Sequence, residues 1–247
     1  MKLIFLLIAS LAISSVFGQG KETKSFLDEN KQPVREKDAS YLVIWQKNKK
    51  AGKYCKTLYN IQGPRISKEN FADPEGRIRE GKCLYYKSTG ALDSSGNYKA
   101  GVQEGLWYFY AENGDVARAK KYNNGALIND TLFTEGWNES VQPASSGHST
   151  TEARLAEGDQ GWTRFLLRNL RYPLEAQQLR ITGRIMLQFI VDENGNVLEP
   201  DIRKSTAYSL DEEALRLIRI SPPWSPASKD GIGVSSYKLQ PIIFRLE

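Results

Sequence analysis

Histidine and cysteine are scarce in this chain, which has one His and two Cys among 247 residues. A zinc site built only from these residue types needs about four ligands, so such a site is excluded. A Ser-His-Asp or Cys-His catalytic centre would depend entirely on His148. This residue lies in a stretch rich in Ser, Thr and Gly, where we expect it to be solvated. No glycine-rich phosphate loop and no paired catalytic carboxylates are found. We therefore expect no enzyme activity, cofactor or metal.

Concentrated charge is also missing, although the net charge is +5. The longest basic run, residues 47–50, contains three Lys and is typical of a solvated turn. Nucleic-acid binding proteins instead carry basic residues clustered on one face or along a helix. The composition, with 40% hydrophobic and 26% charged residues, is that of an ordinary globular protein. We expect protein partners and no nucleic acid.

Only one long apolar run is present, from Leu3 to Phe17. One positive charge, a short apolar region and a small-residue exit at Gly18 are typical of a secretory signal peptide. A membrane-spanning helix usually needs about 20 apolar residues. We expect residues 1–18 to be a signal peptide that is cleaved after Gly18, which would export the chain. The alternative is that the run is retained as a membrane anchor.

A repeat of 24 residues lies in the first half of the chain. Shifting the sequence by this length superimposes five pairs of identical residues: Gly81 and Gly105, Tyr86 and Tyr110, Gly90 and Gly114, Tyr98 and Tyr122, Gly101 and Gly125. Aromatic residues favour pleated strands, and glycine supplies turns that need a positive φ. Each unit is therefore predicted to be a β-hairpin, and an earlier unit begins near Gly52 and is interrupted by an insertion at residues 64–80.

These units, from about residue 52 to 125, resemble MORN-like repeats of the YwqK type. The resemblance implies a stacked β-hairpin sheet with a binding or spacer role. We expect an N-terminal segment at 19–40, this repeat domain at 41–136 and a flexible linker at 137–160. The linker is predicted from its Ser, Thr, Gly and acidic residues and its lack of apolar periodicity.

The two cysteines, Cys55 and Cys83, lie in equivalent strands of this repeat domain. An exported chain is exposed to an oxidising compartment, where two Cys can form a disulfide. Their offset within the repeat differs by one residue, which would direct the two side chains to opposite faces of the sheet. A disulfide and a pair of buried free thiols are therefore both open.

The C-terminal part, residues 161–247, has signals for helices and strands together. Apolar residues recur at helical spacing from Trp162 to Leu170, and a short second helix follows Pro173. Strands are predicted at 182–191 and 197–204, joined by a turn that contains Asn194-Gly195. A third helix is expected to open at Ser209, capped by that Ser and with acidic residues 211–213 in its first turn. A last strand runs from about residue 236 to 246.

This part closely resembles the C-terminal domain of the TonB family, the periplasmic end of the energy transducer for outer-membrane receptors. The resemblance implies an α+β fold with two to three helices packed on a small antiparallel sheet. Its motif residues are structural by chemistry, and Trp224 is expected in the core rather than at a contact. The residues that carry the structural motif are Tyr172, Pro173, Ala176, Gly183, Gly195, Trp224 and Pro226.

Members of this family bind an extended receptor segment by strand addition, and an unpaired sheet edge offers the backbone groups for it. The candidate edge is the last strand, where Pro241 is compatible only with an edge or a bulge. The alternative is that Lys238 and Pro241 protect this edge against pairing. The expected partner-binding residues are Tyr237, Lys238, Leu239, Gln240, Ile242 and Phe244.

We therefore expect an exported, non-enzymatic TonB-like binding module in the periplasm of a Gram-negative bacterium. Its partner would be a segment of an outer-membrane receptor or transporter, and a homodimer is compatible with the sequence. The alternative is a membrane-anchored TonB energy transducer that couples the inner-membrane proton motive force to those receptors. Only the anchored form would contact a motor complex.

Overall fold

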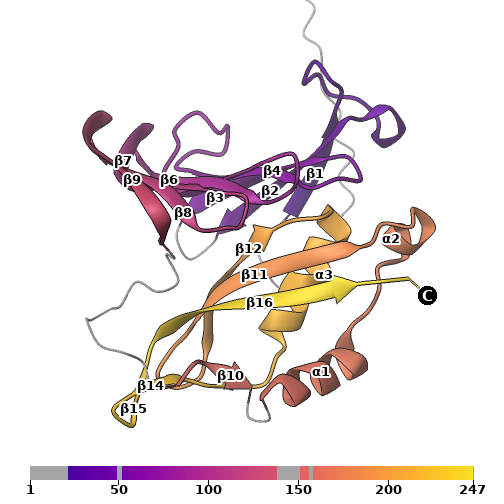
Figure 1. Cartoon of the computed structure of the whole chain (residues 1–247). Coiled ribbons are helices and arrows are strands. Elements are labelled where there is room, and N and C mark those ends of the chain that lie inside the picture. Colours follow the sequence, from indigo (N-terminus) through magenta and orange to yellow (C-terminus); the bar gives the residue numbers. More distant parts are fainter. Residues whose placement is uncertain (1–21, 49–51, 138–150, 156–157, 247) are drawn as a thin grey trace, which may run out of the picture.

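The computed structural model describes residues 22–48, 52–137, 151–155 and 158–246 (Figure 1). These residues form an N-terminal sheet and a C-terminal α+β unit that pack against each other. The expected α+β class and the β-rich N-terminal region are confirmed, and the strand pairs are antiparallel. The apolar run, its expected cleavage site and His148 lie outside the described residues. In the described part of the chain, no helix is long and apolar enough to cross a bilayer.

The N-terminal sheet has nine strands, and each strand pairs with the next one along the chain. The sheet is therefore a meander of antiparallel neighbours, in which residues 28–40 and 72–80 form longer connections than the repeat turns. A single 3-10 turn, Glu36–Asp38, lies between the first two strands. The strands are β1 (Glu22–Leu27), β2 (Tyr41–Asn48), β3 (Lys53–Asn60), β4 (Arg65–Phe71), β5 (Gly81–Tyr86), β6 (Leu92–Lys99), β7 (Val102–Tyr110), β8 (Val116–Asn123) and β9 (Ala126–Trp137).

The 24-residue repeat appears in the backbone as equivalent turns. Gly90 and Gly114 close the β5–β6 and β7–β8 hairpins with φ of 79° and 91°. Their amides donate to the carbonyls of Lys87 and Ala111 at 2.9 and 3.1 Å. Only glycine adopts this left-handed conformation without strain, which explains its recurrence at this position. The register also shifts by one residue just before both turns.

Neighbouring repeat residues point to opposite faces of the sheet. Tyr86 faces the C-terminal unit, whereas Tyr85 stacks on Trp107 on the other face, with ring centroids 6.3 Å apart. Trp107 also makes edge-on contacts with Tyr98 and Tyr122 at 5.1 and 6.4 Å. The repeat aromatics therefore pack the outer face, and the tyrosines that precede the turns supply the inner one.

Cys55 and Cys83 are free in the structure, so the disulfide is not formed. Cys55 lies on β3 and Cys83 on β5, with β4 between them. Strands two positions apart in a sheet are separated by about 9–10 Å, beyond the Cα separation that a disulfide spans. Cys55 pairs with Asn70 of β4, and the β4–β5 register places Cys83 beside the preceding residue, Glu69, on the opposite face.

The C-terminal unit is a three-stranded sheet in the order β12-β11-β16, with helix α3 across one face (Figure 1). Its third helix begins at Tyr208 after an N-cap, Ala207, that makes no side-chain cap; the expected cap at Ser209 is therefore wrong. The elements are β10 (Arg154–Leu155), α1 (Gly158–Asn169), α2 (Leu174–Gln178), β11 (Gly183–Val191), β12 (Val197–Lys204), α3 (Tyr208–Arg219), β13 (Trp224–Ser225), β14 (Ala227–Lys229), β15 (Ile232–Val234) and β16 (Ser236–Phe244).

The core of this unit follows from the alternation along β11. Ile185, Leu187, Phe189 and Val191 are each at most 1% exposed, and they pack against the apolar stripe of α3. The same core continues into the N-terminal sheet, where further buried side chains join it: Leu84, Tyr86, Leu92, Tyr110 and Val116. The two units therefore share one hydrophobic core.

Residues 151–155, which the sequence assigned to the linker, pack against the C-terminal unit instead. Thr151 forms an isolated bridge with Ser228, and Leu155 pairs with Trp224. Ala153 and Leu155 are buried. The apolar side chains at alternating positions are too few to give a periodic signal, so the sequence pattern misses this short strand.

Candidate functional site

Strand β16 is an edge of the C-terminal sheet. It pairs with β11 over its whole length, from Ser236 opposite Val191 to Phe244 opposite Gly183. Among the described residues, no strand pairs with its other side. One row of its backbone N–H and C=O groups is therefore left without a partner strand, which is the arrangement that strand addition requires.

The position of Pro241 indicates which residues of β16 direct their backbone N–H and C=O groups away from β11. The register between β11 and β16 passes through the Pro241–Met186 pair without a shift. Proline has no N–H and is tolerated in an edge strand where its nitrogen points away from the neighbouring strand. Residues of the same parity, Tyr237, Leu239 and Ile243, therefore also direct their backbone groups outward. The Pro241 carbonyl, which accepts from the Gln240 side chain at 3.4 Å, faces outward as well.

The expected partner-binding residues divide between the two faces of β16. Tyr237 and Ile243 are 40% and 47% exposed, whereas Ile242 and Phe244 are at most 1% exposed. The last two belong to the core, since Phe244 packs edge-on against Tyr172 at 5.7 Å. Their assignment to a partner surface is corrected for this reason: their side chains point toward the helices. Lys238 and Gln240 share that inward face, and Leu239 is half-buried on the outer one.

The ion pair at the start of the edge links it to the segment before α1. The Lys238 Nζ lies 3.5 Å from the Glu152 carboxylate, whose side chain is 91% exposed. Such an exposed pair contributes little to stability.

The structural-motif residues of the C-terminal unit occupy buried or closely packed positions. Tyr172 donates to the Ile181 carbonyl at 2.6 Å, and Ala176 is a fully buried residue of α2, whose N-cap is Pro173. A Cβ on Gly183 would lie 2.6 Å from Thr206, and one on Gly195 would lie 2.0 Å from the Trp224 carbonyl. The Pro226 ring lies where a Cβ on Gly233 would meet it, 3.3 Å away.

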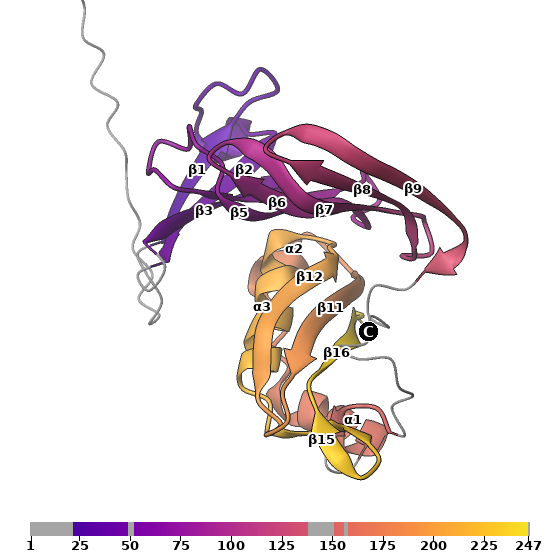
Figure 2. The same cartoon turned by 90° about the vertical axis from the view of Figure 1, so that its left-hand side faces the viewer.

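The opposite edge of the sheet, β12, is in contact with the N-terminal sheet. Ala91 forms an isolated bridge with Lys204, and the Ser205 amide donates to the Gly90 carbonyl at 2.9 Å. The Tyr86 hydroxyl donates to the Ile202 carbonyl at 2.7 Å. Figure 2 shows β12 beneath the N-terminal sheet, and β11 lies between β12 and β16.

A buried arginine lies at the centre of this contact. Arg65, whose side chain is 3% exposed, forms an ion pair with Asp201 at 3.0 Å. Its other terminal nitrogen lies 3.8 Å from Asp211, which is fully buried on α3. The hydroxyl of Tyr59 accepts from Arg65 at 2.8 Å and donates to Asp211 at 3.2 Å. The guanidinium is thus bound by groups from both units.

The two carboxylates differ in their pKa. Burial opposes ionisation of Asp201, but Lys68 and Arg65 outweigh it and lower the pKa to about 2. At Asp211, burial outweighs Arg65 and the hydrogen bonds from Ser205 and Tyr59, and raises the pKa to about 6. The difference arises because Asp201 has two cations within 3.0 Å, whereas Asp211 lies farther from Arg65.

Stability is expected to fall as pH rises from about 4 to about 7, because the folded pKa of Asp211 lies above its unfolded value of about 3.9. The protonated carboxyl is favoured in the folded state, so its contribution is present below pH 4 and is lost as pH rises through 6. A difference of two pKa units corresponds to about 3 kcal/mol. Urea unfolding across this range measures it.

Asp211→Asn is the matched control, since it keeps the shape without the titration. The pH dependence between about pH 4 and 7 should flatten in this variant, and equal slopes in both proteins would contradict the assignment. Asp201 acts in the opposite direction, because its folded pKa is depressed. Its stabilisation is present above about pH 4 and is lost as pH falls toward 2.

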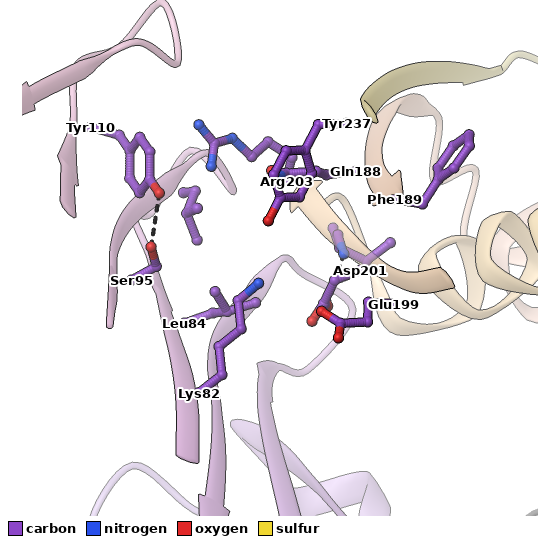
Figure 3. Close-up of a pocket in the computed structure, with 12 residues that line it drawn as sticks. Lys82, Leu84, Ser95, Tyr110, Gln188, Phe189, Glu199, Asp201, Arg203 and Tyr237 are labelled. Atoms are coloured by element: carbon purple, nitrogen blue, oxygen red, sulfur yellow. Dashed lines mark hydrogen bonds between the residues drawn. The ribbon is translucent and has the colours of Figure 1, made fainter. Parts of the chain in front are cut away.

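A small pocket lies between the two units, next to the Arg65 network (Figure 3). Lys82 enters it from the N-terminal sheet, opposite Glu199 and Asp201 of β12. Tyr237 of β16 and Arg203 of β12 border its upper part, and Tyr110 is hydrogen-bonded to Ser95 at 2.8 Å. Charges of both signs line it, and in the described residues no cluster of three metal-ligating side chains occurs. The pocket is therefore a polar part of the interface between the two units.

The sequence patterns do not identify the Arg65 network. Arg65 lies in the insertion that interrupts the earliest repeat, and Asp211 is explained equally well by a helix N-terminus. Tyr59 carries the one usable signal, since it occupies the position of Tyr86 and Tyr110 before the turn. That equivalence indicates a shared face of the sheet, but it does not indicate what the face contacts.

Comparison with protein families finds one matched segment. Residues 168–246 match the family described as Gram-negative bacterial TonB protein C-terminal. The resemblance of the C-terminal unit is thereby supported, together with a TonB-like role in transport. Comparisons with curated proteins and with solved structures found no match. The MORN-like assignment of the repeats stays a prediction.

Proposed function

We propose that this chain is an exported, non-enzymatic TonB-like protein that binds an extended segment of an outer-membrane receptor by strand addition to β16. The observation that carries this proposal is the difference between the two edges of the C-terminal sheet. The β12 edge contacts the N-terminal sheet, whereas the outward backbone of β16 pairs with no described strand. The family match over residues 168–246 supports a receptor as the partner.

The setting of this function is the periplasm of a Gram-negative bacterium. The apolar run from Leu3 to Phe17, followed by Gly18, supports export, and the matched family is one of Gram-negative bacteria. The repeats, proposed to be of the MORN-like YwqK type, hold the binding domain through β12. An anchored energy transducer is the second candidate, favoured by the same apolar run.

The N-terminus of the protein purified from the cell envelope separates these candidates. Mass spectrometry is expected to find a mature chain that begins near Gln19. A chain that retains its first 18 residues would establish the anchored form and overturn export by cleavage.

Strand addition predicts an alternating pattern of amide protection in β16. Synthetic peptides that span the extended periplasmic segments of outer-membrane receptors serve as probes, with hydrogen exchange as the measurement. The amides of Leu239 and Ile243 should gain protection, because they point outward. The amides of Lys238, Gln240 and Ile242 already donate toward β11 and should change little.

Leu239→Pro removes one outward N–H without a loss in the β11 ladder, and is expected to weaken peptide binding about five- to tenfold. Leu239→Val keeps the N–H and is the matched control. Uniform protection along β16, or equal affinity of the two variants, would contradict strand addition at this edge.

A further inference from the structure

Three hairpin turns at one end of the N-terminal sheet, β3–β4, β5–β6 and β7–β8, meet the same short segment, residues 203–205. From the first, the Arg65 amide donates to the Ser205 hydroxyl at 2.8 Å. At the second, the Gly90 carbonyl accepts from the Ser205 amide at 2.9 Å. The third turn presents the Gly114 carbonyl to the Arg203 guanidinium at 3.1 Å. The repeat spacing therefore places one contact from each hairpin on the end of β12.

The tyrosine before each turn strengthens the same contact. Tyr59, Tyr86 and Tyr110 are 1%, 8% and 4% exposed. The first reaches Asp211 of α3 and the second the Ile202 carbonyl of β12. The ring of the third lies 4.0 Å beneath the Arg203 guanidinium. Equivalent repeat positions thus carry equivalent interdomain roles, although the groups that they contact differ.

The other half of β12 is unsuited to pairing for a local reason. Glu199 has a φ of 50°, a left-handed conformation that interrupts an extended strand, and Pro200 follows it without an N–H. The β11–β12 register also shifts in this region, between Gln188 and Ile190. Bulges and prolines of this kind are common protections of sheet edges.

We infer that the N-terminal sheet is a fixed in-chain cap on the β12 edge, which closes this edge to any second strand. The sheet contributes backbone pairing at Lys204, and the buried Arg65 network holds the cap in place. In combination with Glu199 and Pro200, the cap leaves β12 no continuous row of free backbone groups. The C-terminal unit then offers one edge, β16, to a partner strand. The meaning of that single edge depends on the proposed function, but the cap itself does not.

Gly90 and Gly114 provide a matched pair of variants for the test. Both have a positive φ, so an alanine strains each turn alike. A Cβ at Gly90, however, would lie 2.1 Å from the Ser205 carbonyl oxygen, whereas one at Gly114 would meet nothing within 4 Å. Only Gly90→Ala should therefore separate the cap from β12.

Hydrogen exchange of the full chain reports on the contact between the N-terminal sheet and β12. The amides of Arg65 and Ser205 both donate across this contact. Their exchange is expected to be at least about tenfold faster in Gly90→Ala than in Gly114→Ala. Equal exchange of these amides in the two variants would overturn the cap. No receptor peptide is used, so a failure here is separate from a failure of strand addition.

A crosslink tests the closed contact without loss of fold. Ala91 and Lys204 are bridge partners, and antiparallel partners lie about 4.5–5.5 Å apart, within the range for a disulfide. The double variant Ala91→Cys/Lys204→Cys is expected to form this disulfide under mild oxidation, mapped by peptide mass spectrometry. Arg35→Cys/Lys204→Cys is the negative control. Absence of the 91–204 crosslink would overturn the cap.

Discussion

Replacement of Arg65 by methionine is expected to lower the free energy of unfolding by about 3–5 kcal/mol, because the buried Asp211 carboxylate loses its cation and Asp201 keeps only Lys68. Asp211 is fully buried, and the Asp201 side chain is 17% exposed. Methionine keeps much of the side-chain volume, so the loss reports the missing charge and hydrogen bonds. Urea unfolding at neutral pH measures it.

An exposed arginine on the same sheet gives the matched control for this prediction. Arg35 pairs with Asp38 at 3.1 Å, but its side chain is 75% exposed. Arg35→Met should therefore change stability by less than about 1 kcal/mol. When Asp211→Asn is added to Arg65→Met, part of the loss should be restored, because the carboxylate that lost its cation is no longer charged. Similar effects of Arg65→Met and Arg35→Met would contradict the role of the buried network.

Trp224→Ala is expected to cost about 3–5 kcal/mol, the range for removal of a large aromatic side chain from a core. The residue is 3% exposed and packs against Phe189 and Trp162 with ring centroids 5.0 and 5.8 Å apart. Its backbone amide also donates to the Gly195 carbonyl at 2.9 Å, which fixes the β11–β12 turn. Thermal and urea unfolding of the full chain measure the loss.

Two further substitutions separate packing from hydrogen bonding at this position. Trp224→Phe keeps a ring but loses the indole N–H that donates to the Ser221 hydroxyl at 3.0 Å, so its cost should be smaller. Leu167→Ala, at a side chain that is 82% exposed, should change stability by less than about 0.5 kcal/mol. If Trp224→Ala is no more harmful than Leu167→Ala, the core assignment of Trp224 is wrong.

Local signals predicted most elements of the C-terminal unit. The turn between β11 and β12 is an example: the Asp192 carboxylate accepts from the amides of Asn194 and Asn196, and Gly195 has a φ of 82°. These interactions lie within five residues, so the residue types alone indicate them. The first helix begins earlier than expected, at Gly158, because its first turn carries little apolar periodicity.

Local signals were less complete in the repeat sheet. Strand β4 lies within the insertion at 64–80 and was not predicted, because the charged and polar residues of this strand show no clear apolar alternation. The binding edge was only partly predictable as well. The alternation of residues 236–244 indicates a strand, but which side chains face the core depends on the register with β11.

The sequence by itself determined the hairpin repeat, the α+β order of the C-terminal unit and the positions of its turns, because each of these depends on residues close together in the chain. The tertiary structure decided which sheet edge is covered and which is open. That decision depends on contacts such as the one between Arg65 and Ser205, which are 140 residues apart. No local pattern encodes such a pairing. The pairing of the cysteines was also decided by the tertiary structure: Cys55 lies on β3 and Cys83 on β5, and strand β4 between them keeps the two thiols apart.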